Sequence, residues 1–134
     1  MRATRTPLAA FALAIVLSIV ACESSTSTAN IADAWMSTDA DGANRTTVYT
    51  QEATFYAQAD LRNAPDGTLI KGVWTAVNVQ DTEPNLVIAE AELETGSSTV
   101  TFDLTNDGLW PIGTYKIDLY LDGTLTTTVQ FEVQ

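Results

Sequence analysis

The sequence predicts an all-β domain, an antiparallel sandwich of two sheets with about seven strands, over residues 31–134. From Ile31 onward, apolar and polar residues alternate, and no stretch repeats apolar residues at helical spacing. Clusters of Gly, Pro, Asn and Asp separate the alternating stretches at regular intervals. The strands carry more apolar side chains than one sheet can bury, whereas two sheets packed ~10 Å apart can bury them.

The first half of this region contains four candidate strands. They cover residues 31–36, 46–49, 55–61 and 69–79. The third is clear because every second residue from Phe55 to Leu61 is apolar, which places these side chains on one face. The fourth is longer and mostly apolar, with Trp74 near its middle. The first carries Trp35, and the second is a short candidate only.

The second half contains four further candidates. They cover residues 87–94, 99–104, 115–121 and 125–133. In the first of these, alternate residues from Val87 to Leu93 are predicted to face the core. Glu90, Glu92 and Glu94 then form one solvated row, which would also discourage pairing if the strand lies at a sheet edge. Asp122-Gly123 joins the last two strands and is a strong hairpin signal.

The N-terminus reads as an export signal. Arg2 and Arg5 precede an uncharged, mostly apolar run of fourteen residues, 8–21. A helix that crosses ~30 Å of hydrocarbon needs ~20 residues, so a secretory signal explains this run better than a permanent span. A short membrane anchor or a buried helix remains the alternative.

The end of this run, Ile19-Val20-Ala21-Cys22, resembles the lipobox of bacterial lipoproteins. The resemblance implies that residues 1–21 are a lipoprotein signal peptide and that Cys22 carries a covalent lipid, with palmitate among its acyl chains. It also implies a cut before Cys22, so that residues 22–30 become a lipidated N-terminus with a small, polar, flexible linker. Glu23 stands where an Asp tends to mark retention in the inner membrane, which favours the outer membrane in a Gram-negative host.

The charge balance limits the function classes. The chain has 17 acidic and 6 basic residues, a net charge of −11 and no histidine. Removal of residues 1–21 would leave four bases against 17 acids, about −13. Nucleic-acid binding is disfavoured because it needs Lys and Arg on the surface. The lack of histidine removes the commonest general base and the commonest metal ligand.

The C-terminal strands resemble a known signature. Residues 110–115 read Trp-Pro-Ile-Gly-Thr-Tyr, and the pattern continues through 120–123 to 131–133. This pattern is similar to the end of immunoglobulin-like or fibronectin type III-like domains in bacterial surface lipoproteins. The resemblance implies an immunoglobulin-like sandwich in which the Tyr115 hydroxyl bonds back to a nearby backbone group, with Trp74 as the core tryptophan. The two cysteines that bridge the sheets of true immunoglobulin domains are absent.

One segment places oxygen-bearing side chains around a glycine turn, as a calcium loop does. The weak candidate ligands are Asp39, Asp41 and Asn44. When Gly42 is aligned with the glycine of the helix-flanked calcium loop, Val48 stands where the bidentate glutamate belongs. We therefore favour an ordinary Asp-Gly turn and predict no metal and no cofactor, with calcium as the alternative.

Aromatic residues are the other weak candidates for binding. Trp110 precedes Pro111 at a predicted turn, and Tyr56 and Tyr120 fall on outward positions of their strands. Exposed aromatic rings can stack on sugars or anchor protein contacts. The simpler interpretation is that Trp110 packs under its own loop and that the tyrosines cover the sheets.

No pattern in the sequence supports catalysis, because Ser and Thr have no histidine to activate them and Cys22 is assigned to the lipid. The sequence therefore predicts a lipid-anchored, non-catalytic module of the cell envelope that serves in adhesion, assembly or as an accessory subunit. Its expected partners are the membrane, through the anchor, and an unknown protein or glycan. The alternative is a surface lipoprotein that binds a carbohydrate or another solute.

Overall fold

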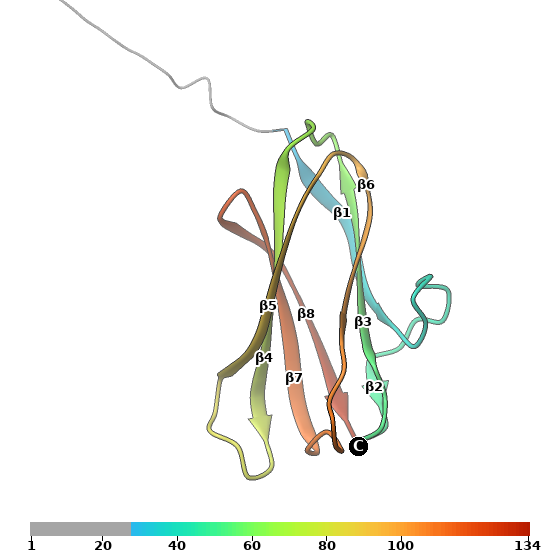
Figure 1. Ribbon diagram of the computed structural model, residues 1–134, viewed down its shortest axis with the longest axis vertical. Helices are drawn as coiled ribbons and strands as arrows, with labels where there is room; N and C mark the ends of the chain where they lie inside the picture. The colour runs from blue at the N-terminus through green and yellow to red at the C-terminus, as the bar shows by residue number, and fades with distance from the viewer. Residues whose placement is uncertain (1–27) are drawn as a thin grey trace, which may run out of the picture.

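The computed structural model describes residues 28–134, which form two β-sheets packed face to face (Figure 1). The predicted signal peptide, Cys22 and most of the predicted linker lie outside the described residues. The eight strands are β1 (Asn30–Ser37), β2 (Val48–Tyr49), β3 (Phe55–Arg62), β4 (Thr68–Val79), β5 (Leu86–Thr95), β6 (Ser98–Leu104), β7 (Gly113–Leu121) and β8 (Thr124–Val133). No helix of the described chain is long and apolar enough to cross a bilayer. The all-β sandwich predicted from alternation is confirmed.

The strand order divides the molecule into a three-stranded sheet, β1-β3-β6, and a five-stranded sheet, β2-β8-β7-β4-β5. All pairs are antiparallel except β2–β8, which is parallel and which the prediction of a purely antiparallel sandwich missed. The reason is a crossing between the sheets. Thr46 N–H donates to Met36 O (3.0 Å) in one sheet, and Glu132 N–H donates to Thr47 O (2.9 Å) in the other. The segment between these two bonds leaves the three-stranded sheet and joins the five-stranded sheet as β2. There β2 runs beside β8 in the same direction.

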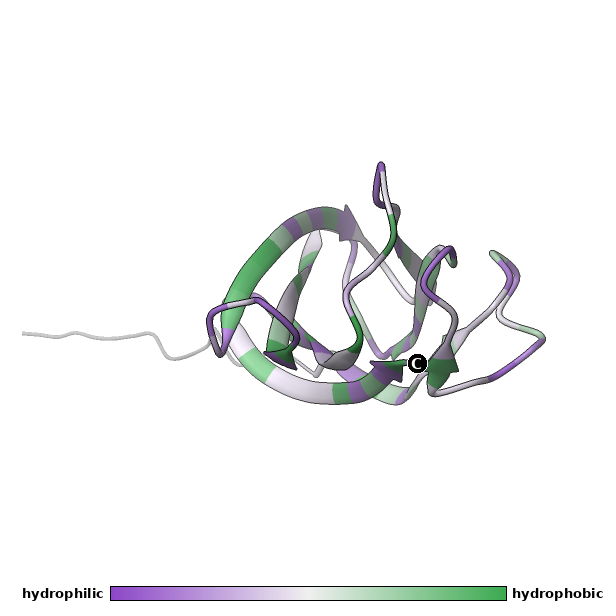
Figure 2. Ribbon diagram, turned by 90° about the horizontal axis from the view of Figure 1, so that it is seen from below, coloured by the Kyte–Doolittle hydropathy of each residue, from purple (hydrophilic) through white to green (hydrophobic). Residues whose placement is uncertain are grey.

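Aromatic rings fill the core between the sheets. Figure 2 shows hydrophobic and hydrophilic residues alternating along the strands, which places one set of side chains toward the core. Phe55 lies at their centre, with its ring centroid 4.4 Å from Trp110 and 4.7 Å from Phe131. Trp74 is 1% exposed, which confirms it as the core tryptophan. Rings of this size contribute more apolar area than any other side chains, so the cluster holds the two sheets together without a disulfide among the described residues.

The tyrosine corner is also present. The Tyr115 hydroxyl donates to Pro111 O at 2.6 Å. Gly113, two residues earlier, has φ +153°, and a Cβ there would lie 2.4 Å from Asn78 O and 2.6 Å from Val79 Cα. Only glycine permits this approach of β7 to the backbone of β4, which explains the Gly-x-Tyr spacing in physical terms.

β5 corrects one prediction about which residues face the core. It is an edge strand, paired only with β4, and most of its residues are exposed. Leu93 was predicted to face the core but is 45% exposed, and Val87 is 50% exposed. A register shift places Val87 opposite Thr75, on the outer face, and leaves Ile88 partly buried against the core. The Glu90, Glu92 and Glu94 row is exposed as predicted.

Gln58 alternates with the core-facing residues of β3 and so lies on the outer face of its sheet, yet it is buried. It is 1% exposed because the loop after β1 folds over the outer face of the three-stranded sheet. Its Nε2 donates to Ala40 O (3.1 Å), and Thr101 Oγ1 donates to its Oε1 (2.6 Å). A buried amide is tolerated when it is hydrogen-bonded, and this amide also fastens the loop to the sheet.

Candidate functional site

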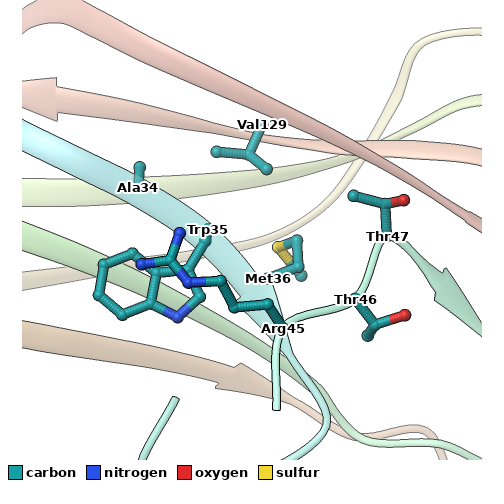
Figure 3. A pocket seen from close by; sticks show the side chains of 7 residues that line it. All are labelled: Ala34, Trp35, Met36, Arg45, Thr46, Thr47 and Val129. Atoms are coloured by element: carbon teal, nitrogen blue, oxygen red, sulfur yellow. The ribbon is translucent and has the colours of Figure 1, made fainter. Parts of the chain in front are cut away.

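A pocket of about 400 Å³ opens at the side of the sandwich, where edge strand β1 lies beside β8 of the other sheet (Figure 3). We call it the lateral pocket. Its lining residues are Ala34, Trp35, Met36, Arg45, Thr46, Thr47 and Val129. The apolar members come from β1 and β8, and the polar members come from the segment that crosses between the sheets. The pocket therefore combines an apolar lining with the cationic side chain of Arg45, and the hydroxyl of Thr46 is already bonded to Val48 in its own segment.

Trp35 and Arg45 are the most specific features of the lateral pocket. The Arg45 guanidinium carbon lies 4.1 Å from the centre of the Trp35 ring. Figure 3 shows the guanidinium lying over the indole. Arg45 Nη2 also donates to Asp33 Oδ2 at 2.9 Å, and Trp35 Nε1 donates to Gly42 O at 2.9 Å. The Arg45 and Asp33 side chains are 56% and 49% exposed, so the ion pair adds little stability. The ion pair orients the guanidinium, and the bond to Gly42 O orients the indole.

Local sequence brings these residues together. The chain turns back after β1 through Asp41-Gly42, and Gly42 has φ +74°, which favours glycine. Arg45 then pairs with Ser37 in an antiparallel bridge, so its side chain returns to the level of Trp35. Sequence reasoning missed this pair because the two residues are ten positions apart. The Asp-Gly turn between them was the available signal.

The residues considered as alternative calcium ligands, Asp39, Asp41 and Asn44, lie in this same turn. The Asp39 carboxylate accepts N–H groups from Asn44 (2.9 Å) and Ala43 (3.1 Å), and the Asn44 bond is the main reason why its pKa is lowered. The side chains of Asp41 and Asn44 are on exposed residues of the loop. No group of three or more His, Cys, Asp or Glu residues within 28–134 could hold a metal ion. The Asp39 oxygens thus serve the loop backbone.

The three aromatic candidates do not share a surface. Trp110 is 7% exposed, its ring stacks on Phe55, and its Nε1 donates to Ala53 O at 2.8 Å. It belongs to the core and does not form an open platform. Tyr56 lies on β3 of one sheet and Tyr120 on β7 of the other, and both are half-buried. Lys71 Nζ lies 5.0 Å from the centre of the Tyr120 ring.

Among the described residues, the buried carboxylate is Asp118, on the outer face of the five-stranded sheet. Thr128 Oγ1 donates to its Oδ1 (2.6 Å), and Lys116 Nζ lies 3.2 Å from its Oδ2. Both carboxylate oxygens therefore have partners within the sheet. This ion pair acts as part of the sheet surface.

No model of a known protein family matches the sequence, and no curated protein matches it. Solved structures do match the fold. An immunoglobulin-like protein from Pseudomonas aeruginosa aligns with a TM-score of 0.55 and 10% sequence identity, over 82% of this chain and 99% of that protein. At this identity the match shows the fold alone: the chain is an immunoglobulin-like β-sandwich.

Two enzymes contain a similar unit. The alkylpurine DNA glycosylase AlkC from Pseudomonas fluorescens aligns with a TM-score of 0.54 and 11% identity, over 81% of this chain. A β-glucosidase from Listeria innocua aligns with a TM-score of 0.51 and 14% identity, over 76% of this chain. The chain spans only 31% of the glycosylase and 16% of the glucosidase. These matches therefore repeat the evidence for the fold and carry none for either reaction.

Proposed function

We propose that this protein is a lipid-anchored, non-catalytic module of the cell envelope, which acts in adhesion, in assembly or as an accessory subunit. The observation that carries the proposal is the place of β1. It begins at Asn30, eight residues after Cys22, at one end of the sandwich. The loops at 80–85 and 105–112 lie at the opposite end (Figure 1). Eight residues reach at most about 29 Å, so a lipid on Cys22 would hold the sandwich near a membrane with these loops facing away.

The charge of the domain supports attachment by lipid rather than by headgroup binding. A body of about −13 is repelled by anionic lipids, so the acyl chains would supply the attachment. A passive role is supported by the lack of histidine in the chain and by the full-length similarity to an immunoglobulin-like protein.

The test is metabolic labelling with radioactive palmitate in a bacterial host. The unchanged chain is expected to incorporate label and to be shortened by its signal peptide, and Cys22→Ser is expected to do neither. Ser24→Ala, two residues away, is the matched control and should behave as the unchanged chain. Equal labelling of the Cys22→Ser chain would refute the anchor.

A second candidate function is the binding of a carbohydrate or another small solute in the lateral pocket. Its volume of about 400 Å³ falls in the ~300–1,000 Å³ range of small-molecule sites. The indole ring and the guanidinium in its lining are groups that suit a polar ring-shaped solute. This candidate places the ligand at the side of the sandwich and not at its loop end.

Nuclear magnetic resonance would decide on this second candidate. A panel of neutral and acidic sugars should shift the indole N–H signal of Trp35 and leave those of the buried Trp74 and Trp110 in place. Arg45→Gln should weaken the effect. If no member of the panel moves the Trp35 signal at millimolar concentration, the lateral pocket is not a sugar site.

A further inference from the structure

A separate, smaller pocket lies at the loop end of the sandwich, opposite the start of β1. We call it the distal pocket. Its volume is about 170 Å³, and its lining includes a first group, Val79, Thr82 and Leu86, and a second group, Trp110, Pro111 and Tyr115. The first group comes from the end of β4, the β4–β5 loop and the start of β5, and the second from the β6–β7 loop and β7.

The size of the distal pocket selects the kind of ligand. Sites for whole small molecules have volumes of ~300–1,000 Å³. A volume of about 170 Å³ equals that of five or six water molecules at ~30 Å³ each. The space therefore fits one large side chain rather than a complete solute.

Hydrogen bonds hold the distal pocket in shape. The Tyr115 hydroxyl donates to Pro111 O (2.6 Å), and Trp110 is fixed by its N–H bonds to the 51–53 segment. Gln80 N–H donates to Ile112 O at 2.9 Å, which ties the two pocket loops to each other. Because the pocket is already formed before binding, binding does not carry the entropy cost of ordering its loops, and this favours affinity.

Exposed apolar residues lie in the segments that form the distal pocket. Seven large hydrophobic residues of the described chain are exposed. Leu86 (42% exposed) lines the pocket, and Leu109 (57%) and Ile112 (38%) flank the lining residues Trp110 and Pro111 in the sequence. Single exposed apolar residues are ordinary, but a group at a pocket is typical of a surface that another protein covers.

The negative charge of the pocket loops favours a partner that carries basic residues. The pocket loops carry Asp81, Glu83 and Asp107, and neither loop contains a Lys or Arg. A second copy of this chain would bring the same carboxylates to the contact, and like charges would oppose it. A partner with basic residues around its apolar contact would be attracted instead.

We propose that the distal pocket docks a segment of another envelope protein, which inserts one large apolar side chain and carries Lys or Arg on both sides of it. This inference rests on the proposed function, because it specifies the partner of a non-catalytic module. It makes the loop end, which faces away from the proposed anchor, the interaction surface of the molecule.

Three synthetic peptides test the proposal against the full protein extracted from membranes in a non-ionic detergent. The first has one Leu flanked by Lys residues, the second has Ala in place of Leu, and the third has Glu in place of Lys. In nuclear magnetic resonance spectra of the protein, the first peptide is expected to shift the signals of Thr82, Ile88 and the Trp110 indole. The second and third should each bind about tenfold more weakly, and added salt should weaken the first.

Variants of the protein supply the control. Leu86→Ser should reduce binding of the Leu peptide, whereas Leu125→Ser, which is 52% exposed and lies in β8 next to the β7–β8 turn, should not. Asp81→Lys with Glu83→Lys should reverse the preference between the Lys and Glu peptides. Equal binding of the Ala peptide, or no shift at the distal pocket at millimolar peptide, would overturn the docking proposal. Neither result depends on palmitate labelling, so the anchor and the docking site can fail separately.

Discussion

Gly113 is the single residue on which the tyrosine corner depends most directly. A methyl group there would meet the Asn78 and Val79 backbone at 2.4 and 2.6 Å. We expect Gly113→Ala to lower the free energy of unfolding by about 3 kcal/mol or more, because overpacking and a strained backbone add. Gly67→Ala is the matched control, since Gly67 has φ +88° with open space around it, and should cost about 1 kcal/mol. Urea unfolding of both variants measures the difference, and equal losses would contradict this account.

Two buried tyrosines make the fold sensitive to alkali. Burial raises the pKa of Tyr49 and of Tyr115 to about 12, from an ordinary value of 10.0. Between pH 10 and 12 the unfolded chain loses these protons while the folded chain keeps them. Stability should therefore be unaffected by these groups below pH 10 and should fall steadily as pH rises towards 12.

Urea unfolding at several pH values between 9 and 12 tests this expectation. The double variant Tyr49→Phe, Tyr115→Phe should be less stable at neutral pH, because two hydroxyl bonds are lost, but should lose less stability as pH rises. An unchanged slope in the double variant would show that other groups cause the alkaline loss.

At the residue scale, sequence reasoning succeeded where the interaction is local. The Tyr115 hydroxyl reaches a carbonyl only four residues back, within the short segment whose resemblance to immunoglobulin-like domains implied this bond. The burial of Trp110 depends on Phe55 and Ala53, more than fifty residues away. The Trp35–Arg45 contact depends on the path of a loop. Such contacts are set by the tertiary structure and leave no periodic signal.

The sequence of β5 opposes the pairing of its exposed backbone edge with another molecule. Within residues 28–134 its outer backbone edge has no partner strand, and the Glu90, Glu92 and Glu94 row is exposed. Replacing all three with Thr should cause concentration-dependent association, measured by analytical ultracentrifugation, because strong β-formers without charge would favour edge pairing. The unfolding free energy should change by about 0.5 kcal/mol or less per site.

The control for β5 removes the same charge elsewhere. Asp41→Asn, Glu52→Gln and Asp66→Asn change three exposed loop carboxylates, and this variant should stay monomeric. If both triple variants associate equally, total charge rather than the edge row keeps the protein apart.

The loop after β1 is predicted to be a structural turn and not a calcium site. Backbone amides already occupy the Asp39 carboxylate, which is the first oxygen donor of the candidate set. Calorimetric titration with calcium should therefore give no binding heat at millimolar concentrations. A saturable heat that Asp39→Asn abolishes would establish a metal site instead.

Strand positions were predictable because alternation is a property of each segment alone. All eight strands fall on segments chosen from the sequence, and the short 46–49 candidate is the two-residue β2. The parallel pairing of β2, the register shift in β5 and its exposure were not predictable. They depend on which strand lies next to each segment, and that information is absent from the segment itself.

At the scale of the whole molecule, the sandwich has two different ends. The start of β1 marks the end that the proposed anchor would hold, and the distal pocket marks the other. The sequence indicated the first end through Cys22 but gave no sign of the second, because its residues come from β4, β5, β7 and two loops. Only the packed structure brings them together.

The most direct test of the account is the intact mass of the protein recovered from membranes. We expect a chain that begins at Cys22 and carries diacylglyceryl and fatty acyl groups on that residue, with N-terminal peptides confirming the site. A chain that retains residues 1–21, or a mature chain whose mass equals that of the unmodified polypeptide, would contradict the anchor and with it the orientation of the two ends.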